Sequence, residues 1–87
     1  MNNLLKYKLC SEVSATATGK LLYLVLNDLA NNGGEVTIPQ RRISDALRIS
    51  RSAVRRNLRR LERNGAISIF AQYHSDGGRA ANKYIVR

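Results

Sequence analysis

Residues 50–65, SRSAVRRNLRRLERNG, constrain the fold of this chain most strongly, because six arginines share the segment with only three large aliphatic residues. At 100° per residue, Val54, Leu58 and Leu61 fall within about 60° of one another on a helical wheel. The opposite half of the wheel holds Ser52 and all the arginines: Arg51, Arg55, Arg56, Arg59, Arg60 and Arg63. The pattern predicts a helix that packs on a core along one side and presents cations on the other. Ser50 is expected to cap this helix, and Asn64 and Gly65 are expected to end it.

The arginines of this segment lack the counter-charges that a solvated helix usually carries. Their i,i+4 neighbours are other arginines, and each such pair is unfavourable by about 0.2–0.5 kcal/mol in an isolated helix. Glu62 is the one acid among them. A self-repelling face with no internal counter-charge favours an external polyanion over a merely solvated surface.

The charge of the whole chain is concentrated around this helix. The 87 residues carry a net charge of +9, and residues 39–63 alone contribute +7. A membrane-binding helix would need a broad exposed apolar face, whereas the three aliphatic side chains here are needed by the core. Nucleic acid is therefore the favoured polyanion.

Other features narrow the class of protein. Cys10 is the only cysteine and His74 the only histidine, so we expect no internal disulfide, no zinc site and no cofactor. The chain contains no catalytic motif, which predicts that it is not an enzyme. The run LLYLVL is shorter than a membrane span, and the first residues lack the apolar core of a secretory signal, so a cytoplasmic protein is expected.

Three further segments precede the arginine helix. Leucines and Val25 recur at helical spacing over residues 16–31, where NNGG is expected to end a helix. Residues 4–10, within an N-terminal segment 1–14, fit either a short strand or an irregular arm. EVTIP alternates like a very short strand, and Pro39 fits the first position of a helix over residues 39–47. The buried face of that helix is expected to hold Ile43, Ala46 and Leu47.

The segment after the arginine helix changes to a period of two. From Ala66, the predicted inward positions of a strand are Ile67, Ile69, Ala71 and Tyr73. HSDGGRAAN supplies a turn and KYIV returns as a second strand, so the C-terminal residues predict a β-hairpin. The tyrosines are expected to pack in the core and in this hairpin. A short helix and tight turn before the arginine helix make it the second helix of a helix-turn-helix, the element that enters the major groove of DNA.

The segment RISDALRISRSAVRRNLRRLERNGAI resembles the winged helix-turn-helix superfamily, with its L-A-x-x-L helix, turn, and S-R-x-x-V recognition helix. The string formed by Asp76, Gly77, Gly78, Arg79, Asn82 and Tyr84 is similar to the wing of small helix-turn-helix domains in phage and plasmid replication proteins and bacterial regulators. The length predicts one domain over residues 1–87. The resemblance covers the chain from about Thr16 to the C-terminus and implies an α+β fold, a three-helix winged helix-turn-helix with the motif at 39–64 and a C-terminal hairpin wing at 66–87. Two positions depart from it. Arg48 stands where many relatives have the turn glycine, and Ser44 replaces a small alanine, so its hydroxyl needs a partner if buried.

The resemblance implies a DNA-binding role for twelve residues. Arg51, Ser52, Arg55 and Arg56 would lie at the groove, with Arg59 and Arg60 nearer the phosphates. Gln40, Arg41 and Arg42 would meet the backbone, and His74, Arg79 and Lys83 would approach an adjacent minor groove or its phosphates. Because arginine bonds bidentately to guanine, one or two of Arg51, Arg55 and Arg56 are expected to read G.

The function expected from these features is sequence-specific binding of double-stranded DNA, as a transcriptional regulator or as a replication or mobile-element accessory factor of a bacterium or phage. A homodimer through the N-terminal arm and the first helix is expected, with no small-molecule ligand. The alternatives are an RNA-binding or protein-interaction winged helix, or a DNA-binding fragment of a longer replication initiator. The arginine face distinguishes these alternatives, because a protein-binding version would carry exposed aromatic side chains there and an RNA-binding version would more often add stacking ones, and residues 50–65 contain neither.

Overall fold

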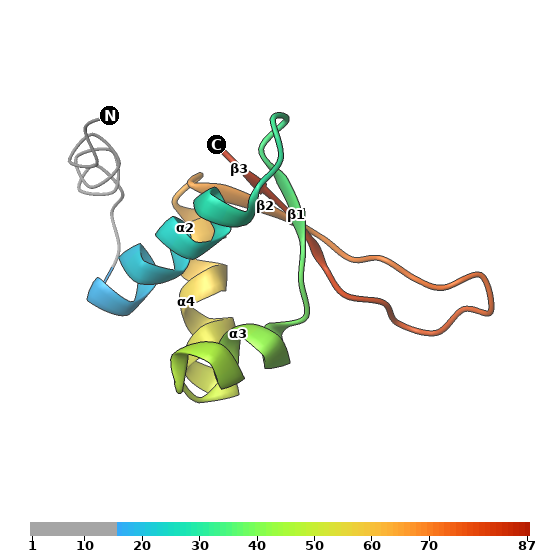
Figure 1. Ribbon diagram of the computed structural model, residues 1–87, viewed down its shortest axis with the longest axis horizontal. Coiled ribbons are helices and arrows are strands. Elements are labelled where there is room, and N and C mark those ends of the chain that lie inside the picture. Colours follow the sequence, from blue (N-terminus) through green and yellow to red (C-terminus); the bar gives the residue numbers. More distant parts are fainter. Residues whose placement is uncertain (1–15) are drawn as a thin grey trace.

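A computed structural model describes residues 16–87, which form three helices and a small sheet around one core. In chain order the elements are α2 (Ala17–Leu29), β1 (Glu35–Thr37), α3 (Gln40–Leu47), α4 (Arg51–Arg63), β2 (Ile67–Phe70) and β3 (Lys83–Val86). Figure 1 shows the hairpin that joins β2 to β3 extending away from the helices. The predicted α+β winged helix-turn-helix with a C-terminal hairpin is confirmed. The arm or strand predicted in residues 1–14, with Cys10, lies outside the described residues.

Helix α2 begins and ends close to its predicted limits. Thr16 caps its start, because its Oγ1 accepts a hydrogen bond from the amide of Gly19 at 3.0 Å. The helix ends at Leu29, since Ala30 returns to extended backbone, and NNGG forms the turn into β1 instead of a left-handed helix cap. In that turn the Asn31 side chain accepts from two backbone amides, at 2.9 and 3.0 Å. No helix within residues 16–87 is long and apolar enough to cross a membrane.

The sheet is antiparallel with strand order β1-β3-β2, so the last strand of the chain lies in its centre. Tyr84 on β3 is opposite Val36 on one side and Ile69 on the other. Gly34, which leads into β1, has φ of 76°, and a Cβ there would lie 2.9 Å from the carbonyl oxygen of Val86. Only glycine fits this close approach, which brings the short predicted strand against the hairpin.

The core lies between the three helices and the sheet. Its eight buried hydrophobic side chains are Leu22, Leu26, Ile43, Val54, Leu58, Leu61, Ile67 and Tyr84. Val54, Leu58 and Leu61 are fully buried, which confirms the predicted inner side of α4. Each such side chain contributes about 1.5–3 kcal/mol on burial. The rotation of α4 about its own axis is therefore fixed from the inside.

Five positions predicted to face inward are exposed: Leu21, Leu29, Ala46, Ala71 and Tyr73. Tyr73 is 64% exposed because β2 ends at Phe70, and the hairpin beyond it projects past the helices with one further bridge, Tyr73 to Arg79. Leu29, at the last turn of α2, is 53% exposed, and Ala46 of α3 faces solvent. Of the tyrosines expected to pack in the core or the hairpin, Tyr84 is fully buried and Tyr23 packs against the core. Tyr73 lies in the hairpin beside Arg79 but is exposed, and Tyr7 lies outside the described residues.

The turn between α3 and α4 accommodates the two residues that depart from the winged-helix pattern. Arg48 takes the left-handed conformation, with φ of 53° and ψ of 45°, that a glycine would adopt more easily. Ser44 is 8% exposed, and its hydroxyl donates to the carbonyl oxygen of Ile49 at 2.5 Å. The backbone oxygen of Ser44 accepts from the amides of Arg48 and Ile49. Ser44 thus has the partner that its burial was expected to require, and it fixes the turn.

Candidate nucleic-acid interface

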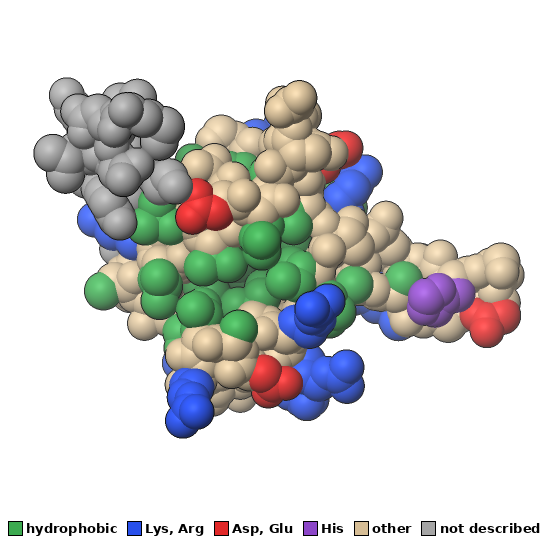
Figure 2. Space-filling model, in the orientation of Figure 1, with side chains coloured by type: hydrophobic (Ala, Val, Ile, Leu, Met, Phe, Trp, Pro, Cys, Tyr) green, Lys and Arg blue, Asp and Glu red, His purple; other side chains and the backbone are tan. Residues whose placement is uncertain are grey.

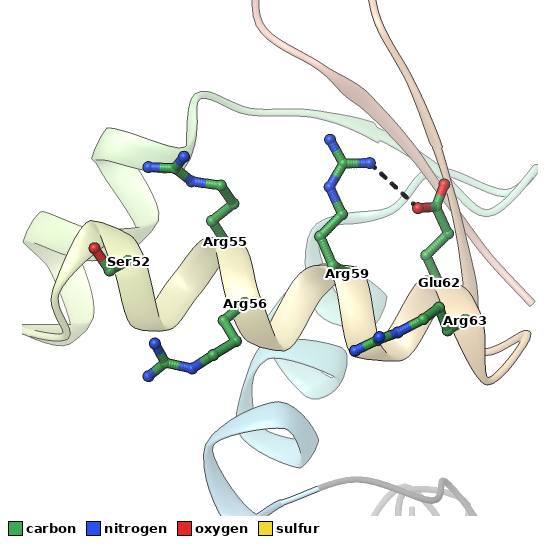
Figure 3. Close-up of a pocket in the computed structure, with 6 residues that line it drawn as sticks. All are labelled: Ser52, Arg55, Arg56, Arg59, Glu62 and Arg63. Carbon is green, nitrogen blue, oxygen red and sulfur yellow. Dashed lines mark hydrogen bonds and ion pairs between the residues drawn. The ribbon is translucent and has the colours of Figure 1, made fainter.

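Helix α4 presents its arginines on the side opposite the core. Its first turn is capped as predicted, because Ser50 Oγ accepts from the amide of Ala53 at 3.1 Å. All six arginines of the helix are exposed. Figure 3 shows that Arg55 and Arg59 project to one side of the helix and Arg56 to the other. The cations therefore form two rows with the helix backbone between them.

One acidic side chain lies within this face. Glu62 Oε1 is 3.4 Å from Nη1 of Arg59, and the two side chains are 35% and 62% exposed. The prediction of a face with no internal counter-charge is therefore wrong at Arg59. Within residues 16–87 the other five arginines of α4 have no acidic partner, so most of the like-charge repulsion remains.

A shallow cavity of about 540 Å³ runs along the outer face of α4. It brings together four residues of the predicted site: Ser52, Arg55, Arg56 and Arg59. Arg63 and Glu62 also line it, although neither was among the predicted site residues; their wheel positions beside the other arginines could have identified them. Guanidinium groups match the two acceptors of guanine, and a carboxylate can accept from the amino group of cytosine, so this face can read base edges.

Asn57, on the inner side of α4, is a residue that sequence reasoning missed. It is 9% exposed, and its Oδ1 accepts from the hydroxyl of Thr16 at 2.7 Å. Its Nδ2 donates to the carbonyl oxygen of Ala53 at 2.8 Å. The N-cap residue of α2 is thus bonded to the middle of α4, which helps to set the angle at which the arginine face is presented.

The start of α3 lies beside this face. Pro39 is the N-cap, one position before its predicted place, and no side chain caps the first amides of the helix. Arg41 and Arg42 are exposed, whereas the side-chain amide of Gln40 is turned toward the hydroxyl of Tyr84, at 3.5 Å. Uncapped amides at a helix start are suited to anions.

The wing holds its cations by internal contacts. Arg79 donates to the carbonyl oxygen of Gln72 at 3.3 Å and to Asn82 Oδ1 at 3.0 Å, and its guanidinium lies 5.4 Å from the ring centre of Tyr73. Lys83 lies 3.7 Å from a carboxylate oxygen of Glu35 and 5.5 Å from the ring centre of Phe70. His74 is exposed in the turn, where its backbone bonds to Gly77 and Gly78.

A second cavity, of about 470 Å³, lies between α4, the start of α3 and the wing. It brings four predicted site residues together from three parts of the chain: Gln40, Arg55, Arg59 and Arg79. The other six predicted residues line neither cavity: Arg41, Arg42, Arg51, Arg60, His74 and Lys83. The two cavities share Arg55 and Arg59, and together they gather the remaining half of the predicted site into one cationic surface.

Comparison with known proteins identifies the family to which the chain belongs. No curated protein and no solved structure matches the chain significantly. A family model described as a helix-turn-helix domain matches residues 16–67, which is more than half of the chain and runs from the cap of α2 to the start of β2. Together with the three helices and the capped, arginine-bearing α4, this match shows that the chain belongs to the helix-turn-helix domain family of DNA-binding domains.

Proposed function

We propose that this protein binds double-stranded DNA sequence-specifically, with α4 in the major groove and the wing against an adjacent minor groove or its phosphates. The observation that carries this proposal is the outer face of α4, where five exposed arginines have no acidic partner among the described residues. Such a surface is unfavourable for the free protein and complementary to a polyanion. The α+β fold places the hairpin beside that face.

The proposed biological role is regulation of transcription, or accessory work in replication of a bacterial or phage element, without enzymatic activity. Selection from a random duplex library distinguishes a specific binder from a general one, because a specific binder enriches a common sequence. Recovery of unrelated sequences would contradict sequence-specific binding.

A homodimer is part of this proposal, because specific sites usually contain two half-sites. Helix α2 supports it with Leu21 and Leu29, which are 42% and 53% exposed. Figure 2 shows hydrophobic side chains gathered over α2 and α3 on the face in view. Sedimentation of the protein with a selected duplex should give two chains per palindromic site; one chain per site would contradict the dimer.

The central test is fluorescence anisotropy with duplex DNA over a range of salt concentrations. The slope of log K against log[salt] should steepen by about 0.9 for each phosphate that the protein neutralises. A slope near zero would overturn the proposal.

Arg56→Ala should relax the sequence preference if Arg56 contacts a base, whereas Arg60→Ala should weaken binding to all duplexes alike. Identical behaviour of the two variants would contradict the division between reading and anchoring arginines.

RNA binding is the second candidate, and the wing supports it. Phe70 and Tyr73 are 44% and 64% exposed, and each ring has a cation close to its face. Exposed aromatic rings beside cations are suited to stack on unpaired bases. Single-stranded RNA that competes with duplex DNA at equal concentration, and fails to compete after Tyr73→Ala, would favour this candidate over the first.

A further inference from the structure

The cavity between α4 and the wing is lined by cations from two separate elements. Arg55 and Arg59 come from α4 and Arg79 comes from the wing. The remaining lining residues are uncharged: Pro39, Gln40, Ala80, Ala81 and Asn82. Among residues 16–87, no acidic side chain lines this cavity, although Glu62, which is not one of its lining residues, pairs with Arg59. Three arginines from two elements thus line one cavity of about 470 Å³.

Two of these guanidinium groups are already held in place. The two terminal nitrogens of Arg79 bond to the Gln72 carbonyl and to Asn82, which uses two of its five N–H donors and leaves three for a ligand. Arg59 is held by Glu62 at 3.4 Å. Side chains that are ordered before binding lose less conformational freedom when a ligand arrives.

The uncharged walls fit the passage of a nucleic-acid backbone. Ala80 and Ala81 have small side chains, so a sugar-phosphate chain can approach the wing closely. Pro39 and Gln40 place the uncapped start of α3 at the same cavity, and its amides add partial positive charge. A guanidinium group can bond to a phosphate through two parallel N–H donors, so each of these arginines is suited to bind a phosphate.

We propose that this cavity holds a single phosphate of the DNA backbone, bound jointly by α4 and the wing. The proposal rests on the proposed binding of duplex DNA and makes it more specific. The backbone of one strand passes between Arg59 and Arg79, so that the position of α4 in its groove determines where the wing meets the duplex. The wing and the helix then act as one clamp on a shared phosphate.

Salt dependence tests whether the phosphate is shared. Arg59→Ala, Arg79→Ala and the double variant are titrated with one duplex by anisotropy at several salt concentrations, and each slope is divided by the number of chains bound to the duplex. A shared phosphate releases its counterions once, so the slope of log K against log[salt] should fall by no more than about 0.9 in the double variant. The fold-loss in affinity of the double variant should be smaller than the product of the two single losses. A fall of about 1.8 with multiplying losses means two separate phosphates and overturns the proposal.

Arg60 provides the matched control. It is an exposed arginine of α4 that does not line this cavity. In the pair Arg60→Ala with Arg79→Ala, the fold-losses should multiply. If this pair also falls short of the product, the coupling comes from the general field of α4 and the shared phosphate is contradicted.

A second measurement remains decisive if Arg79→Ala loosens the hairpin. Single phosphates of the duplex are replaced in turn by uncharged methylphosphonates, and binding is compared in the native protein, in Arg59→Ala and in Arg79→Ala. One phosphate should be found whose neutralisation weakens the native protein and has less effect in both variants. Sensitivity at two different phosphates overturns the shared site. Failure of the native protein to bind any duplex overturns the proposed function instead, so the two failures are distinguishable.

Discussion

The outer face of α4 and the wing carry the same kind of charge but use it differently. Of the six arginines on α4, only Arg59 has an acidic partner among the described residues. In the wing, Arg79 bonds to both Gln72 and Asn82, and Lys83 lies near Glu35. The number of cations identifies a basic surface. The internal partners of each cation show which charges already stabilise the fold and which have no partner within it.

The physical reason for the difference is the distance of each region from the core. Helix α4 is held from the inside by Val54, Leu58 and Leu61, so its fold needs nothing from its arginines. The hairpin beyond Phe70 has no core beneath it and depends on cross-strand bonds such as Tyr73 with Arg79. Removing a cation from α4 should therefore leave its fold intact, whereas removing Arg79 from the wing should also loosen the local structure.

The largest effect is expected from replacing both Arg55 and Arg56 by Ala. Each arginine that contacts a base contributes about 1–3 kcal/mol to DNA binding, so affinity should fall by about tenfold or more. The free energy of unfolding should stay the same or rise by a few tenths of a kcal/mol, because like-charge pairs disappear. Anisotropy and urea denaturation measure the two quantities. A loss of stability that matches the loss of affinity would remove the contrast with the wing.

The next effect is expected from Arg79→Ala, which should loosen the hairpin. Loss of two side-chain hydrogen bonds at an exposed site should lower the free energy of local opening by about 1 kcal/mol. Hydrogen exchange of the Ala80 amide, which bonds to the carbonyl of Gln72, should accelerate while amides of α4 keep their protection. Arg60→Ala serves as the control and should leave this exchange unchanged. Equal exchange in both variants would mean that Arg79 does not hold the wing.

A smaller effect is expected from Glu62→Gln, which makes α4 uniformly cationic. An exposed ion pair contributes about 0.2–1 kcal/mol, so stability should change little. Affinity for random duplexes should rise slightly, because one repulsive carboxylate is removed from the face that meets the phosphates. Anisotropy with a random and a selected duplex measures the change. A fall in affinity for the random duplex would show that Glu62 supports general binding rather than limiting it.

The smallest effect is expected from Lys83→Gln. Its pair with Glu35 spans 3.7 Å between half-exposed side chains, which is typical of a surface ion pair worth well under about 1 kcal/mol. The midpoint temperature of thermal unfolding should shift by less in Lys83→Gln than in Arg79→Ala. A larger shift would place Lys83 among the residues that hold the hairpin.

The sequence predicted α4 well because its two kinds of residue separate cleanly on a helical wheel. The buried side chains Val54, Leu58 and Leu61 and the cap Ser50 follow from spacing and local chemistry. A hydrogen-bond partner for Ser44 was expected because a buried hydroxyl must be bonded, and in the structure that partner is the carbonyl oxygen of Ile49. Local rules thus suffice where neighbours along the chain decide the outcome.

The parts that escaped prediction depend on contacts between distant residues. Asn57 is polar at a buried wheel position, and only the packing of α2 brings Thr16 to it across 41 positions of sequence. Tyr73 alternates correctly for a strand, but alternation does not reveal where the sheet leaves the core. The approach of Arg79 to Arg55 likewise depends on the direction of the hairpin.

The five arginines of α4 that have no acidic partner among the described residues also make the stability of the unbound protein depend on ionic strength. Salt screens repulsion between like charges on an exposed surface, with a screening length of about 10 Å at 0.1 M. Added salt should therefore stabilise the fold of the unbound chain while it weakens attachment to a polyanion. High salt should therefore stabilise the unbound protein most and also release its ligand most readily. At low salt the unbound protein is least stable and gains the most stability from binding.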